Sequence, residues 1–155
     1  MPTPPCAEPL PGLFHFADTC NVYVLRDGEE GLAVDFGSGQ WLRQLPALGI
    51  KRLDRVLLTH HHDDQVAGLA ALKARPFAVH APVGEDRYLD PARAGDYSGP
   101  PWFEIGCPES YLPPARRVSG IAYDLAGFDS FWWRGRKISV LHTPGHGPNG
   151  CSFVL

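Results

Sequence analysis

The feature that most constrains the fold of this chain is an apolar run that leads directly into a cluster of metal-binding side chains. Residues 56–58 (Val-Leu-Leu) have the composition of a buried strand, and residues 59–64 read Thr-His-His-His-Asp-Asp. On an extended backbone alternate side chains point the same way, so His60, His62 and Asp64 can converge while the residues between them face elsewhere. Two imidazoles and a carboxylate at the end of a strand form a suitable ligand set for zinc or iron.

A second segment near the end of the chain repeats this layout. The mostly apolar residues 138–141 (Ile-Ser-Val-Leu) lead into His142, the dipeptide Pro144-Gly145 and His146. Proline fixes φ and glycine accepts conformations that other residues avoid, so the dipeptide predicts a defined turn that presents the two histidines. Five of the seven histidines therefore lie in two short segments, each after a predicted strand.

Together the two segments resemble the metallo-β-lactamase superfamily of metal-dependent hydrolases, through Thr-His-x-His-x-Asp after an apolar strand and His-Thr-Pro-Gly-His further on. Residues 33–37 (Ala-Val-Asp-Phe-Gly) are similar to the family strand that ends in Asp-x-Gly, and Gly68 lies where the family has a glycine. The resemblance runs from about Leu13 to the last residue. It implies an α/β fold, the αββα sandwich of the superfamily, as one domain over residues 1–155.

The resemblance also implies a site and a reaction. His60, His62 and His146 would hold one zinc ion, and we expect their two segments to end adjacent strands at the same edge of the sheet. Asp64 would be the catalytic residue, either as a ligand of a second metal or by orienting the nucleophile. Zinc lowers the pKa of a bound water to roughly 7, and the resulting hydroxide would attack an ester, thioester, lactone or amide. Asp35 is predicted either to accept a hydrogen bond from one of the histidines or to cap its own loop.

Two departures from the family pattern change the expectation. Gln65 stands where the family most often has another histidine, and a neutral amide is a poor zinc ligand, so we expect the second metal position to be weak or empty. The later aspartate and histidine of the family have no counterpart before the chain stops at residues 151–155. We therefore expect only the N-terminal part of the fold, incomplete at its C-terminus and inactive alone, with exposed apolar surface at its last residues and around Leu125, Trp132 and Trp133.

Two other functions remain open at this point. Members of the same superfamily hold a single iron and oxidise sulfur compounds, and iron is compatible with imidazole and carboxylate ligands. A di-iron site is disfavoured because that branch has a glutamate where this chain has His62. The remaining alternative is a non-catalytic member whose metal site is degraded from Gln65 onward.

Composition restricts the partners and the compartment. The net charge of −3 gives no electrostatic reason to expect nucleic acid or an anionic membrane, so we predict a small-molecule substrate. Apolar runs fall short of the roughly 18 residues that span a bilayer, and the first residues lack the basic and apolar regions of a signal peptide, which predicts a cytoplasmic protein. The sequence leaves an oligomer open.

Strands and helices are expected to alternate, with a largely buried sheet covered by helices. Residues 91–119 interrupt the pattern, because they hold six prolines and several aromatic residues. We predict that this insertion loop walls the mouth of the active site or packs as an arm on the body or on another subunit. The expected strands are 13–16, 21–25, 32–35, 55–59, 77–80, 121–125, 128–133 and 137–141, and the expected helices are 40–48, 64–74 and 83–89.

Overall fold

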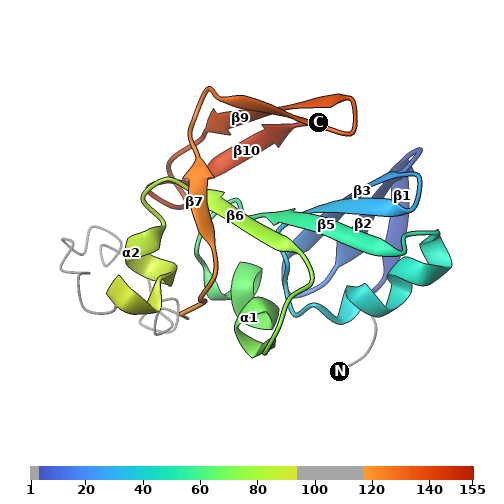
Figure 1. The fold of residues 1–155 in the computed structure, drawn as a ribbon, viewed down its shortest axis with the longest axis horizontal. Coiled ribbons are helices and arrows are strands. Elements are labelled where there is room, and N and C mark those ends of the chain that lie inside the picture. The colour runs from blue at the N-terminus through green and yellow to red at the C-terminus, as the bar shows by residue number, and fades with distance from the viewer. Residues whose placement is uncertain (1–3, 94–116) are drawn as a thin grey trace.

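A computed structural model of the chain describes residues 4–93 and 117–155. Most of the predicted insertion loop 91–119, including its aromatic residues, lies outside these ranges. Within them the chain forms two β-sheets and a set of helices (Figure 1). The order of the strands along the chain follows the prediction closely, with one strand more at the start and one more at the end than the listed ranges.

The larger sheet has seven strands in sequential order, antiparallel over the first four and parallel from the fourth to the seventh. Its first strand is missing from the prediction because all five of its residues are exposed, so they show no apolar alternation. The parallel half is where the chain crosses over through helices, as parallel strands require. The strands are β1 (Cys6–Leu10), β2 (Leu13–Ala17), β3 (Asn21–Asp27), β4 (Glu30–Val34), β5 (Arg52–Leu57), β6 (Ala78–Pro82) and β7 (Ala122–Leu125).

The smaller sheet consists of β8 (Ser130–Trp133), β9 (Arg136–His142) and β10 (Cys151–Val154), paired antiparallel in the order β10-β9-β8. It lies across one face of the larger sheet (Figure 1). The strand that precedes the second histidine segment, β9, therefore belongs to a different sheet from β5, and our expectation that the two strands are neighbours is wrong. The interface between the sheets is a buried apolar cluster that includes Leu25, Leu32, Leu57, Trp133, Ile138 and Val140.

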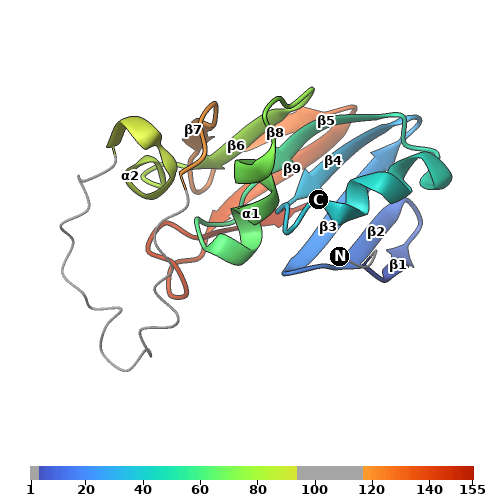
Figure 2. The same ribbon diagram turned by 90° about the horizontal axis from the view of Figure 1, so that it is seen from below.

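Helices cover the opposite face of the larger sheet (Figures 1 and 2). The first, η1 (Gln40–Leu48), is a 3₁₀ helix, and its buried Trp41 donates a hydrogen bond from Nε1 to the Phe36 carbonyl at 2.7 Å. Next, α1 (Asp63–Ala71) starts directly after the first histidine segment and ends three residues before its predicted end, because Leu72 adopts an extended backbone. The remaining helices are α2 (Asp86–Leu89) and the 3₁₀ turn η2 (Pro91–Arg93).

The outer face of the smaller sheet carries exposed apolar side chains, among them Trp132 at 69% exposure and Val154 at 54%. Our expectation that Leu125 and Trp133 also lack cover is wrong. They are 6% and 2% exposed because they point into the space between the two sheets. Among the described residues, none of the helices has both the length and the apolar character needed to cross a membrane.

Candidate metal centre

Three histidines from the two segments meet at one point. His60 and His62 lie between the end of β5 and the start of α1, and His146 lies in the loop between β9 and β10. The ligand nitrogens of the three side chains are all within 4.8 Å of one another. Their rings stand nearly perpendicular in pairs, with centroid separations of 4.5, 4.6 and 4.8 Å. The structure thus brings together the three imidazoles that the sequence grouped.

Backbone contacts between the sheets explain why the segments meet. The Cys151 amide at the start of β10 donates to the Thr59 carbonyl at 3.0 Å, which joins the smaller sheet to the segment that follows β5. Within the second segment, the Thr143 amide donates to the Gly150 carbonyl at 2.9 Å and closes the loop that carries His146. A Cβ at Gly147 would lie 3.4 Å from the Cβ of His60, so the two loops are in van der Waals contact.

His60 is held in one orientation and one tautomer by a relay of hydrogen bonds. The Asp35 carboxylate accepts from both the amide and the hydroxyl of Thr59, at 2.8 and 2.9 Å. When Asp35 is ionised, the single proton of the hydroxyl goes to it, and the Thr59 oxygen accepts from His60 Nδ1 at 2.8 Å. The lone pair of His60 therefore lies on Nε2. The described residues therefore show Asp35 accepting from Thr59 and not, as the first of its two predicted roles required, from a histidine; Asp35 reaches His60 only through Thr59.

The Nε2 atom of His60 is a buried nitrogen without a hydrogen-bond partner among the described residues. Its side chain is 8% exposed, and burial, followed by the neighbouring histidines, lowers its pKa to about 3. His60 is therefore neutral at ordinary pH, as a metal ligand must be. A buried acceptor without a partner is costly, and a cation at this point would satisfy it.

The spacing of the other two histidines also suits a metal ion. His62 Nδ1 and His146 Nε2 are 3.0 Å apart. This is close to the roughly 3.3 Å that separates two nitrogens when each lies about 2.0–2.1 Å from a tetrahedral zinc. Burial lowers the pKa of His62 as well, with added repulsion from its histidine neighbours. His146 is exposed, so its ring is free to adjust to an ion while His60 remains fixed. The residues present therefore fit a single divalent cation with three imidazole ligands.

Asp64 and Gln65 stand apart from this cluster. Asp64 is exposed in the first turn of α1, and its backbone carbonyl accepts a hydrogen bond from the Thr19 hydroxyl at 2.8 Å. Its negative charge acts to raise the pKa of His62, which places the carboxylate near the cluster, although the group of converging ligands does not include it. Gln65 is buried, and its side-chain oxygen has no hydrogen-bond partner in the described part of the chain.

Other side chains of metal-binding type lie outside the cluster. His142 is the last residue of β9 and is exposed, and His80 pairs with Asp124 at 2.9 Å. Cys151 is buried, and burial raises the pKa of its thiol to about 12. The thiol points toward the Leu58 carbonyl at 3.7 Å.

The sequence patterns gave no sign of Glu85, which contacts both histidine segments, because a single glutamate after a glycine has no distinctive spacing.

Comparison with known proteins identifies the family. The family model described as the metallo-beta-lactamase superfamily matches residues 15–155. The chain belongs to the metallo-β-lactamase superfamily. The first histidine segment, the second one and most of both sheets lie inside the matched range, so the predicted family and its α/β fold are confirmed.

Several curated relatives are named as hydrolases. A hydroxyacylglutathione hydrolase of Dechloromonas aromatica (strain RCB) is 29% identical over 126 residues, which cover 81% of this chain and 36% of the relative. An atrochrysone carboxyl ACP thioesterase of Passalora fulva is 30% identical over 151 residues, or 94% of this chain and 36% of the relative. The chain thus spans about a third of the length of the curated relatives that it matches.

Solved structures share the fold at low sequence identity. A metallo-β-lactamase from Cronobacter sakazakii, described by its HARLDQ motif, superimposes with a TM-score of 0.69 at 21% identity, over 96% of this chain and 58% of that one. A metallo-β-lactamase from Novosphingobium pentaromativorans gives 0.68 at 20% identity, over 92% and 52%. The motif HARLDQ has His, Asp and Gln at the spacing of His60, Asp64 and Gln65 in this chain. A glutamine at this position therefore also occurs in the motif of another protein of this fold.

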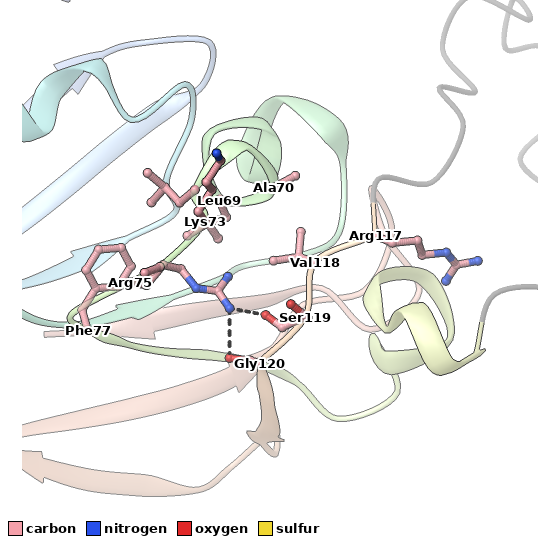
Figure 3. A pocket seen from close by; sticks show the side chains of 11 residues that line it. Leu69, Ala70, Lys73, Arg75, Phe77, Arg117, Val118, Ser119 and Gly120 are labelled. Carbon is pink, nitrogen blue, oxygen red and sulfur yellow. Dashed lines mark hydrogen bonds between the residues drawn. The ribbon is translucent and has the colours of Figure 1, made fainter.

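A cavity of about 310 Å³ lies away from the histidine cluster, between the C-terminal end of α1 and residues 117–120 (Figure 3). Arg75 crosses its opening and donates to the carbonyls of Ser119 and Gly120. None of the three clustered histidines lines this cavity. Arg75 and Arg117 in its lining already donate to backbone carbonyls, and the cavity is not the site that the two histidine segments build.

Proposed function

We propose that this protein is a metal-dependent hydrolase in which His60, His62 and His146 hold one divalent ion, with zinc as the preferred metal. The observation that carries the proposal is the buried Nε2 of His60, which has no partner among the described residues and faces two further imidazoles. Three imidazoles and an open fourth position are the ligand set of catalytic rather than structural zinc.

The ion, the pair Thr59 and Asp35, and Asp64 each have a separate task in this proposal. When bound, the ion supplies a Lewis acid to the scissile carbonyl and an activated water. Thr59 and Asp35 keep the lone pair of His60 on Nε2, toward the centre. Asp64, in the first turn of α1, is proposed to orient the attacking water and to take its proton.

The substrate class is proposed from the names of relatives. An ester, thioester, lactone or amide each suits an activated water, and two relatives are named as an acylglutathione hydrolase and a thioesterase. We therefore favour a thioester. We also propose that only one metal is held tightly, because Gln65 offers an amide where a second site needs an imidazole.

Elemental analysis of the purified protein tests the metal, with a pair of histidine variants as the contrast. His146→Ala removes a ligand, whereas His142→Ala removes an exposed histidine of the same segment that lies outside the cluster. We expect one equivalent of zinc in the parent protein and in His142→Ala, and a loss of at least 100-fold in zinc affinity in His146→Ala. Equal zinc binding by the two variants would contradict the ligand set. Two tightly bound equivalents of zinc in the parent protein would contradict the single site. Iron as the native metal would favour the oxidoreductase alternative.

Activity is tested in the full-length protein, with the Asp64→Asn variant and a panel of acyl thioesters. If Asp64 orients the water, the variant keeps its zinc and loses turnover by roughly 10²–10⁴-fold, the usual contribution of a general base. Loss of zinc together with turnover would instead make Asp64 a ligand. A full-length parent protein that binds zinc and cleaves no thioester, ester, lactone or amide would overturn the hydrolase proposal and leave only the metal site.

A further inference from the structure

Glu85 is a fully buried carboxylate that the proposed mechanism leaves unused. It lies in the turn between β6 and α2, and its side chain is 0% exposed. One of its oxygens accepts a hydrogen bond from His61 Nδ1 at 2.8 Å, and the other accepts from Asn149 Nδ2 at 3.2 Å. A buried carboxylate is costly unless it is well paired, so both contacts are needed to keep it in the interior.

The two partners of Glu85 come from the two different histidine segments. His61 lies between the ligands His60 and His62, and Asn149 follows His146 by three residues in the loop that leads into β10. Glu85 therefore touches the chain on both sides of the metal centre. The separation between the two loops depends on where this carboxylate is held.

The surroundings of Glu85 fix its position. Gly84 has a φ of +91°, which favours glycine, and a Cβ there would lie 3.0 Å from Asn149 Oδ1, so the turn and the second segment are tightly packed. On the other side, the His61 ring stacks on Tyr88 of α2 with centroids 3.9 Å apart and an interplanar angle of 12°. Both hydrogen-bond partners of the Glu85 carboxylate are thus also fixed by packing.

We propose that Glu85 is a positioning residue for the metal centre: by bonding His61 and Asn149 it holds the first and second histidine segments at the separation that lets His62 and His146 share one ion. This inference rests on the proposed metal site. Groups that orient metal ligands from behind in this way typically change metal affinity by about 10–100-fold when they are removed.

The test uses Glu85→Gln and Asn149→Ala, with Glu29→Gln as a control that makes the same chemical change at an exposed glutamate. Zinc affinity is measured by competition with a chromophoric chelator, and ligand geometry is measured by the visible absorption of the cobalt-substituted protein. We expect zinc affinity to fall by about 10–100-fold in both test variants, with an altered cobalt spectrum, and to stay within twofold of the parent in the control. In the double variant the loss should be smaller than the product of the two single losses, because Asn149 acts through Glu85.

The outcomes separate this inference from the proposal on which it rests. A parent protein that binds neither zinc nor cobalt removes the metal site itself. A parent that binds both, together with test variants of unchanged affinity and spectrum, overturns the role of Glu85 alone. A residue needed only for folding would lower the unfolding midpoint of the metal-free protein and leave the cobalt spectrum of the folded fraction intact, which also overturns the proposal. If Glu85→Gln does not fold, Asn149→Ala decides, because Asn149 is only partly buried.

Discussion

Replacement of Gly68 by alanine should destabilise the protein although it adds a better helix former. Gly68 lies inside α1, where a glycine costs roughly 1 kcal/mol relative to alanine, so propensity alone predicts a gain of that size. In the structure, however, a Cβ at this position would lie 2.4 Å from the Ser38 carbonyl oxygen and 2.9 Å from that of Gly37. Cβ atoms in folded proteins essentially never approach other atoms so closely, so the helix or the turn must move.

Hydrogen bonds resist that movement. The Gly68 amide donates to the Gly37 carbonyl at 2.8 Å, and the Gly37 amide donates to the Gln65 carbonyl at 3.0 Å. The Ser38 hydroxyl donates to Asp18 Oδ1 at 2.6 Å and holds the turn from its other side. Overpacking of this kind costs about 1–3 kcal/mol, and each weakened hydrogen bond adds about 1 kcal/mol. After the gain in propensity is subtracted, we expect a net loss of about 2–3 kcal/mol.

Thermal and urea unfolding measure this loss. For a chain of this length, 1 kcal/mol corresponds to about 2–4 °C, so Gly68→Ala should lower Tm by roughly 5–10 °C. The control is Ala70→Gly, an exposed position of the same helix, which should cost only the propensity difference of about 1 kcal/mol. Because α1 begins directly after His62, zinc affinity should fall in Gly68→Ala and not in the control. A Gly68→Ala protein as stable as the parent would refute the close approach of α1 to the turn.

Three further predictions concern the metal centre. Thr59→Val keeps the side-chain shape but removes the hydroxyl between Asp35 and His60, so zinc affinity should fall about 10-fold in chelator competition, and an unchanged affinity would contradict the relay. Removal of the metal with EDTA should lower Tm by about 10 °C relative to protein with zinc at 1,000 times its Kd, since such binding contributes about 4 kcal/mol, and an equal Tm in both forms would contradict a tight site. In the metal-free protein, burial lowers the pKa of His60 to about 3, so the stability that His60 contributes falls as pH drops below 6.5. Burial raises the pKa of Asp35 to about 7, so the stability that Asp35 contributes falls as pH rises from about 4 to about 7. The two slopes oppose each other between about pH 4 and 6.5, so Asp35→Asn should lose about 2 kcal/mol more than the parent between pH 6.5 and 5.0 in urea unfolding, and parallel pH profiles of the two proteins would contradict the assigned shifts.

Features encoded by neighbouring residues could be predicted from the sequence. The alternation of buried and exposed residues in β2 and β3, the apolar run of β5 and the punctuation by glycine and proline located most elements to within a few residues. The alternation in His-x-His predicted that His60 and His62 converge, because an extended backbone fixes side-chain direction over a few residues, and the resemblance to the family added His146. These signals are local and need no knowledge of how the chain packs.

The tertiary structure alone decided what joins those segments. The second histidine segment follows a strand of a separate sheet, and the pairing of strands far apart in sequence leaves no mark in the residues of either strand. Burial of Leu125 and Trp133, the exposure of Asp64 and the unpaired Nε2 of His60 likewise depend on which faces the two sheets turn toward each other. Glu85 shows the reason most clearly: it bonds residues 24 positions before it and 64 positions after it, and only the folded chain places them side by side.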